Sequence, residues 1–119
     1  MSDTVKALAI KRWDIVVVPF PYIDSAKESK RPALIISDAA MHEEFDTCWA
    51  MMITSAKKSR WECDIAINNL TKAGLPVPCV IRPVKLAAID LSRILRKTGS
   101  LDTSERRKIS KFLQHQFLK

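Results

Sequence analysis

The order of apolar and polar stretches along the chain predicts a mainly β structure with a helix at its end. Runs rich in β-branched and other apolar residues are typical of strands in a buried or half-buried sheet. Such runs cover residues 14–18, 31–37, 47–55, 64–67, 78–82 and 85–89. A turn or short helix is expected around 39–45, and the polar residues 22–31 predict a loop. Five or six short strands imply a small barrel or sandwich.

The last segment predicts an amphipathic helix. Asp102 and Glu105 have the spacing of a capping box at a helix start. The apolar residues that follow recur at i, i+3, i+4 and i+8, as Ile109, Phe112, Leu113 and Phe117. We expect this stripe to pack on the sheet. The basic residues between its members are expected to lie mainly outward, and these are Arg106, Arg107, Lys108 and Lys111.

Composition places these elements in one small soluble domain that covers residues 1–119. The chain holds only two glycines and no Ser/Gly-rich linker, so nothing predicts a boundary inside it. The longest apolar run, residues 48–53, is far shorter than the ~20 residues that span a bilayer. Residues 1–10 lack the features of a secretory signal. We therefore expect a cytoplasmic protein without a membrane partner.

The residue types that carry metal and cofactor chemistry are sparse. Cys48, Cys63 and Cys79 lie far apart, without a C-x-x-C pair, and suit neither a zinc site nor a disulfide scaffold. The two histidines do not predict an acid-base pair either, because His115 is expected on the surface of the terminal helix. No G-x-S-x-G motif, phosphate-binding loop or dinucleotide fingerprint occurs. The sequence predicts no metal and no cofactor.

Positive charge is concentrated near the end of the chain. The net charge is +7, of which residues 1–90 supply +1 (12 Lys and Arg against 11 Asp and Glu) and residues 91–119 supply +6 (8 against 2). A basic surface attracts polyanions, so nucleic acid and acidic protein segments are the partners to consider first. The excess, however, coincides with the predicted helix, where the same charges can simply keep a packed helix soluble.

Arg31 and the pair Thr54 and Ser55 are the strongest candidates for site chemistry, because each lies at the end of a predicted strand. If the two strands are neighbours, a guanidinium and two hydroxyls face the same phosphate. Such a site can bind or cleave a phosphodiester. Spacing alone, however, favours a plainer alternative in which Arg31 pairs with a loop carboxylate such as Asp24 or Glu28, and the hydroxyl pair closes a turn.

Several segments together carry a family resemblance. The first is WDIVVVPFPYID over residues 13–24, followed by RPALIIS over 31–37. Shorter matches follow as ITS (53–55), GLP (74–76), VIRP (80–83) and KL (85–86). Over residues 11–118 the chain resembles the PemK/MazF-like family of bacterial toxins. The first two segments are fairly specific, because they combine three features in order. These are a strand, a Pro-Phe sequence where that strand ends, and an Arg-Pro-Ala-Leu sequence where the next strand begins.

The resemblance implies a small SH3-like β-barrel of the plasmid-maintenance-toxin type, mainly β with added helices. It also implies a homodimer that cuts single-stranded RNA without a metal, leaving a 2′,3′-cyclic phosphate and a 5′-hydroxyl. The cognate antitoxin is expected to cover the groove with an acidic, partly disordered segment. Trp49 or Trp61 is a candidate for the dimer face.

Arg31 and Thr54 match the catalytic positions of the family. We expect Arg31 to stabilise charge on the phosphorane rather than to act as a base, because its pKa exceeds about 12. Ser55 is expected to help orient the phosphate. The remaining predicted RNA-binding residues are Phe20 and Tyr22, which would stack an unpaired base, and Lys30, Lys57, Lys58 and Arg82, which would follow the backbone.

Trp13 departs from the family pattern, which has glycine before Asp14. We do not expect tryptophan to adopt a backbone conformation that only glycine tolerates, so either φ is negative here or the start of the first strand is altered. Packing in the core is the favoured role for the ring, and stacking on RNA is the alternative.

Two other functions remain open at this point. One is a non-enzymatic toxin on the same fold that binds a protein such as DNA gyrase. The other is a degenerate family member retained as a nucleic-acid-binding module. The intact Arg31, Thr54 and Ser55 favour the ribonuclease over both.

Overall fold

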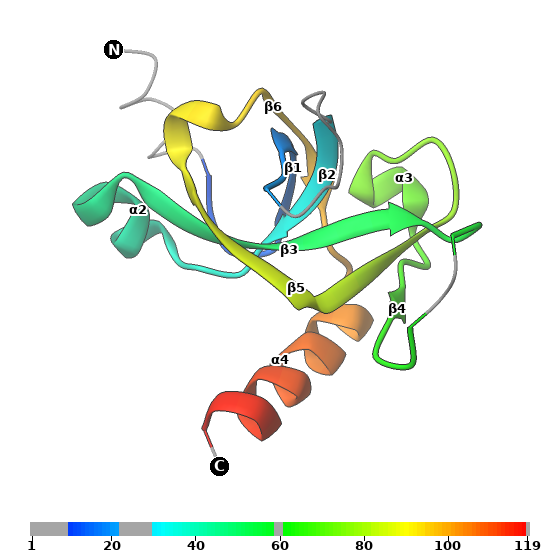
Figure 1. Cartoon of the computed structure of the whole chain (residues 1–119). Coiled ribbons are helices and arrows are strands. Elements are labelled where there is room, and N and C mark those ends of the chain that lie inside the picture. The colour runs from blue at the N-terminus through cyan, green and yellow to red at the C-terminus, as the bar shows by residue number, and fades with distance from the viewer. Residues whose placement is uncertain (1–9, 22–29, 59–60, 119) are drawn as a thin grey trace.

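The computed structural model describes residues 10–21, 30–58 and 61–118, and Figure 1 shows their arrangement. Six antiparallel strands form one curved sheet, a half-barrel, in the order β4-β5-β3-β2-β1-β6. The strands are β1 (Asp14–Pro19), β2 (Lys30–Ile35), β3 (Thr47–Ser55), β4 (Ile65–Ala66), β5 (Cys79–Asp90) and β6 (Arg96–Ser100). The helices are α2 (Ala39–Phe45), α3 (Leu70–Ala73), the 3-10 turn η1 (Leu91–Arg93) and α4 (Thr103–Phe117). The predicted mainly β fold with a C-terminal helix is confirmed.

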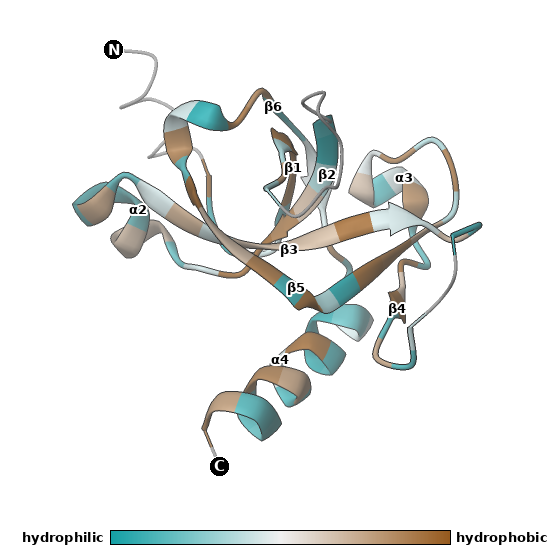
Figure 2. Ribbon diagram, in the orientation of Figure 1, coloured by the Kyte–Doolittle hydropathy of each residue, from teal (hydrophilic) through white to brown (hydrophobic). Residues whose placement is uncertain are grey.

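Both faces of the sheet are buried, which explains why β3 is apolar along most of its length. Cys48, Ala50 and Met52 belong to one core cluster with residues of β1 and of the second half of β5. Met51 and Ile53 point the other way, into a second cluster that includes residues of α3 and α4. Figure 2 shows the hydrophobic residues concentrated in the strands, whereas α4 alternates hydrophobic and hydrophilic residues.

The two predicted strands over 78–82 and 85–89 are one strand, β5. It pairs with β3 on both sides of a bulge, with Met52 opposite Arg82 and Met51 opposite Leu86. Pro83 is one of the residues of β5 that the bulge leaves without a partner on β3. The backbone N–H that proline lacks is therefore not needed for a hydrogen bond between these two strands.

Besides the 3-10 turn η1, two elements were not predicted. The strand β6 has the polar sequence RKTGS and lies at the edge of the sheet beside β1. The helix α3 is a single turn, capped by the side chain of Asn69, which accepts a hydrogen bond from Lys72 N at 3.0 Å. It ends at Gly74 with φ of 71°. Both elements are short and lack an apolar period.

The predicted helix at the end of the chain forms as α4, but its stripe packs only in part. Ile109 is fully buried, and Phe112 and Leu113 pack against the second core cluster. Phe117 is 62% exposed, contrary to the prediction that it packs on the sheet. Arg106 also departs from its predicted outward position, because its Nε donates to the carbonyl of Leu101 at 2.7 Å.

The predicted capping box at the start of α4 does not form. Asp102 occupies the N-cap position without a side-chain cap hydrogen bond and instead pairs with Lys72, whose Nζ lies 3.2 Å from Oδ1. This hydrogen bond lowers the pKa of Asp102. Glu105 is fully buried and accepts hydrogen bonds from the backbone N–H of Asn68 and from Ser104. Glu105 therefore ties α4 to the segment between β4 and α3.

Trp13 has a φ of 77°, so the expectation of a negative φ is wrong. Its backbone is fixed on both sides, since its N–H donates to Ile35 O and its carbonyl accepts from Leu101 N, each at 2.8 Å. The ring packs on the second core cluster, as predicted, and the guanidinium of Arg106 lies 5.9 Å from its centroid. Packing of the ring offsets the strain of a left-handed tryptophan, which costs about 1–2 kcal/mol.

The left-handed backbone at Trp13 predicts an unusual order of stabilities. Trp13→Ala loses the ring but keeps the strain, whereas Trp13→Gly loses the ring and removes the strain. We expect both variants to be less stable than the wild type, with the glycine variant about 1 kcal/mol more stable than the alanine variant. Urea unfolding measures this difference. An alanine variant at least as stable as the glycine variant would argue against strain at this position.

Candidate active site

Arg31 of β2 and Thr54 of β3 lie opposite each other on one face of the sheet. The pairing of Ala33 with Met52, continued along the two antiparallel strands, brings Arg31 beside Thr54. The guanidinium Nη1 of Arg31 donates to Thr54 Oγ1 at 3.3 Å. Thr54 is 4% exposed, so its hydroxyl is held in place by the surrounding sheet. The structure thus brings together Arg31 and Thr54, which the sequence analysis predicted to be catalytic.

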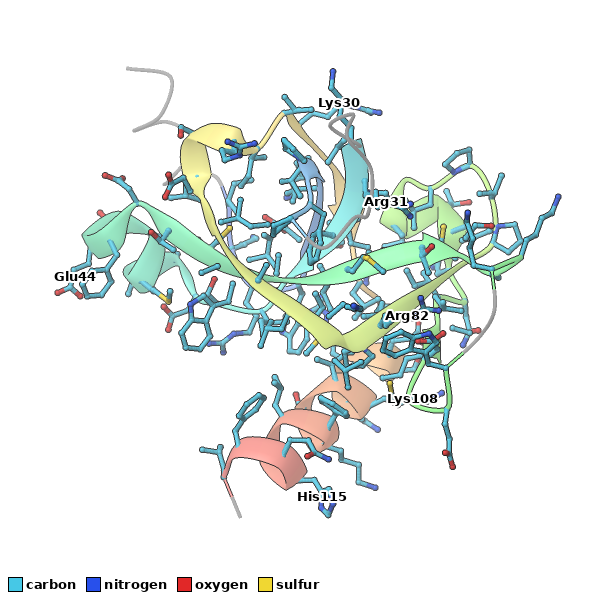
Figure 3. All side chains as sticks on the ribbon, viewed as in Figure 1. Lys30, Arg31, Glu44, Arg82, Lys108 and His115 are labelled. Carbon is cyan, nitrogen blue, oxygen red and sulfur yellow. The ribbon has the colours of Figure 1, made fainter. Side chains whose placement is uncertain are left out.

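A groove of about 420 Å³ opens beside this pair. Strand ends form one wall, and the segment between α3 and β5 forms the other. The lining residues are Lys30, Arg31, Pro32, Ile53, Thr54, Ser55, Leu75, Pro76, Val77 and Cys79. Figure 3 shows Arg31 between β2 and the part of the chain that contains α3. The wall from Leu75 to Val77 was not identified as part of the site, although Gly74 and Pro76 do mark it as a turn.

Arg31 presents an unused hydrogen-bond donor in this groove. Its Nε is buried and has no partner among the residues that the structure describes. A buried donor without a partner costs about 1–3 kcal/mol, and such groups are rare in folded proteins. Arg31 also lines the groove, and its planar guanidinium suits a phosphate. The alternative partners of Arg31, Asp24 and Glu28, lie outside the described residues.

Ser55 takes part in the turn that follows β3. Its side-chain Oγ accepts a hydrogen bond from Lys57 N at 3.2 Å, and its carbonyl accepts one from Lys58 N at 3.1 Å. Ser55 therefore closes a turn, as in the alternative interpretation of the hydroxyl pair. Thr54 instead accepts the hydrogen bond from Arg31. Lys57 and Lys58 are exposed in this turn, and Lys30 is exposed at the start of β2.

Two of the predicted RNA-binding residues are buried, which contradicts their assignment. Phe20 is 4% exposed and belongs to the first core cluster, so its ring offers no surface for a base. Arg82 is 7% exposed, and its Nε and Nη2 donate to Asp64 Oδ1 and Oδ2 at 3.0 and 2.9 Å. The hydrogen bond with Asp64 raises the pKa of Arg82. Tyr22 lies outside the described residues.

Among the described residues that line it, the groove offers neither a carboxylate nor a histidine. Its titratable thiol, Cys79, donates to Val77 O at 3.3 Å, and burial raises its pKa, which keeps it protonated at neutral pH. Cys48 lies in the core, where burial and the negative charge of Asp90 raise its pKa to about 12. Neither cysteine is an activated nucleophile.

The histidines do not contribute to the groove either. His42 is fully buried in α2, between Ser37 Oγ at 2.6 Å and the carbonyl of Ile10 at 2.9 Å. His115 is exposed near the end of α4. Within residues 10–21, 30–58 and 61–118, no three His, Cys, Asp or Glu side chains come close enough to hold a metal ion. In the same ranges, no helix combines the length and apolar character needed to cross a membrane.

Comparison with protein families gives one match. The model of the PemK-like, MazF-like toxin of type II toxin-antitoxin systems covers residues 11–117. This chain therefore belongs to the PemK/MazF-like toxin family, as the sequence motifs predicted. Comparison with curated proteins gave no significant match.

Solved structures share the fold at low sequence identity. MazF (Form-I) from Deinococcus radiodurans superposes with a TM-score of 0.73 at 17% identity, covering 92% of this chain and 97% of that chain. An endoribonuclease in complex with its cognate antitoxin, from Mycobacterial species, gives 0.68 at 15% identity over 90% and 91%. The Mycobacterium tuberculosis toxin MazF-mt6 gives 0.67 at 16% identity over 86% and 93%.

Proposed function

We propose that this toxin is a sequence-selective endoribonuclease that cuts single-stranded RNA, including mRNA, in the cytoplasm. The observation that supports this most directly is the Arg31 and Thr54 pair, which lies at the lining of an open groove. The family assignment agrees with it, and one structural relative bears the name endoribonuclease.

The proposed reaction uses a nucleophile that the substrate carries. The RNA 2′-oxygen attacks the adjacent phosphorus and loses its proton, and the bond to the 5′-oxygen breaks as that oxygen gains a proton. The products are a 2′,3′-cyclic phosphate and a 5′-hydroxyl. No activated water is needed for this step, so no metal-bound hydroxide is required. We therefore expect cleavage to be independent of metal ions.

Arg31 has the central role in this mechanism. Negative charge grows on the phosphorane oxygens, and a fixed guanidinium beside them stabilises the transition state. Thr54 holds Nη1 and so orients the other N–H groups of Arg31 toward the groove. Lys30, Lys57 and Lys58 are exposed around the groove and are suited to contacts with the RNA backbone.

A direct test combines chemistry and specificity. The purified protein is incubated with a long mixed-sequence RNA in excess EDTA, and the new 5′-hydroxyl ends are sequenced. We expect cuts at one short motif, with cyclic phosphate on the upstream fragments, and the same cuts in the presence of Mg²⁺. Intact RNA in both conditions would refute the proposed activity and favour a toxin that binds a protein target such as DNA gyrase.

We also propose that a cognate antitoxin blocks this groove with an acidic, partly disordered segment. Lys30, Arg31, Lys57 and Lys58 give the groove and its rim a positive charge that an acidic peptide complements. Related MazF structures from Deinococcus radiodurans include complexes of MazE with MazF.

A homodimer is the third part of the proposal, and an apolar groove of about 580 Å³ is the surface that favours it. Trp49 and Phe117 line it and are 49% and 62% exposed, which is unusual for a monomer. If a second copy covers this face, Trp49→Glu shifts the protein from dimer to monomer in sedimentation equilibrium. A wild-type monomer, or a dimer that the charge leaves unchanged, would count against this surface.

A further inference from the structure

Trp61 stands out among the exposed residues because two cations lie against its ring. The ring is 42% exposed. The guanidinium carbon of Arg82 lies 4.6 Å from the ring centroid, and Lys85 Nζ lies 5.3 Å from it. An aromatic side chain in this setting is held in place but still has free surface.

A buried carboxylate fixes the position of this ring. Asp64 Oδ2 accepts a hydrogen bond from Trp61 N at 2.8 Å, and the Asp64 N–H donates to the Trp61 carbonyl at 3.0 Å. The same carboxylate binds Arg82 through both oxygens, and its side chain is 0% exposed. Residues 61–64 are thereby anchored to β5. The backbone that carries the ring is thus fixed, and Arg82 lies against the ring itself, so less conformational entropy is lost when a ligand stacks on it.

The ring lies near the candidate active site. Arg82 pairs with Met52, and Thr54 is two residues further along β3, about 7 Å away. Alternation along the strand places Thr54, Met52 and Arg82 on one face of the sheet. Figure 3 shows Arg31 and Arg82 in the same half of the molecule, away from α2. Arg82, against which the Trp61 ring lies, and Arg31 therefore lie toward the same end of β3.

We propose that Trp61 stacks an unpaired base beside the scissile phosphate, and this rests on the proposed ribonuclease function. Aromatic rings with adjacent cations are typical supports for single-stranded nucleic acid, because every base has a π-face. Lys85 places a positive charge against the ring, which favours contact with the adjacent RNA backbone. Trp61 takes the stacking role that buried Phe20 does not provide.

A purely structural role for Trp61 makes a different prediction. If the ring only shields the Asp64–Arg82 ion pair from water, its removal lowers stability and leaves the interaction with RNA unchanged. The two roles are separated by KM, kcat and substrate length, measured on proteins whose folded fraction is checked by circular dichroism.

The experiment uses a short RNA with one mapped cleavage site and a series trimmed from each end. We expect Trp61→Ala to raise KM for the full-length RNA by about 5- to 100-fold, with kcat within about twofold of wild type. Trp61→Phe keeps an aromatic face and is expected to remain within about threefold. On an RNA trimmed of the stacked nucleotide, all three proteins should have the same KM. Phe45→Ala removes an exposed aromatic from α2 and serves as the matched control.

The outcomes distinguish this inference from the proposed function. If wild type cuts RNA and Trp61→Ala has an unchanged KM on every substrate, the stacking role is wrong and the ribonuclease remains. A KM that rises equally on full-length and trimmed RNA also refutes stacking on a flanking base. If wild type cuts no RNA, both proposals fail.

Discussion

Arg31→Ala is expected to lower the rate of RNA cleavage by about 10³-fold, the loss typical when a preorganised donor to a transition-state charge is removed. The fold should remain, because the hydrogen bond from Arg31 to Thr54 joins two strands that also pair through their backbones. Among the described residues the Nε of Arg31 has no partner, so we expect its removal to leave the melting temperature unchanged or slightly higher. Single-turnover cleavage and thermal unfolding measure the two effects.

Two variants sharpen this test. Arg31→Lys keeps the charge but lacks the planar fork, and we expect it to retain at most about one hundredth of the wild-type rate. Lys108→Ala removes the same amount of charge from the exposed face of α4, at a residue that does not line the groove, and should cut RNA like the wild type. Equal losses for Arg31→Ala and Lys108→Ala would mean that total charge, rather than the guanidinium in the groove, supports activity.

Gly99→Ala is expected to destabilise the fold by about 3 kcal/mol. A Cβ on Gly99 would lie 2.1 Å from the carbonyl oxygen of Lys72, and 2.6 Å from the carbonyl carbon of Ala73. These are backbone atoms of α3, so no side chain can move aside. The end of α3 approaches β6 equally closely, because a Cβ on Gly74 would lie 2.0 Å from the carbonyl oxygen of Thr98.

Guanidinium chloride unfolding measures this loss, with Ser100→Ala on the same strand as the control. If Gly99→Ala is too unstable to purify, the loss of stability is at least as large as the free energy of unfolding of the wild type. The double variant with Gly99→Ala and Gly74→Ala tests whether the two substitutions affect stability independently. A Gly99→Ala variant that is as stable as Ser100→Ala would show that α3 and β6 do not pack this closely.

The strands were predicted where burial on both faces leaves a clear apolar run, as in β3. The edge strand β6 escaped prediction because its stability comes from backbone pairing with β1 and from the close contact at Gly99, neither of which leaves an apolar pattern. The left-handed Trp13 could not be anticipated either. Two backbone hydrogen bonds hold it, and their partners Ile35 and Leu101 are distant in sequence.

The part of the candidate site that lies at the ends of strands could be predicted from the sequence. Arg31 and Thr54 lie at the ends of two runs that are easily recognised, and pairing of β2 with β3 brings them together. Phe20 and Arg82 were misassigned because exposure was assumed from residue type. The partner of Arg82 is Asp64, and only the pairing of β4 with β5 places these residues side by side.

The strand order of the sheet has a consequence for how the toxin is made. β1, the first strand, lies between β2 and the last strand, β6, whose final residue is Ser100. A nascent chain therefore leaves one edge of β1 open until residue 100 has left the ribosome, and the second core cluster stays uncovered until α4 follows. Chains released early from a broken message would expose both surfaces and become targets for proteolysis. The fold is therefore completed only after residues 96–117 have emerged.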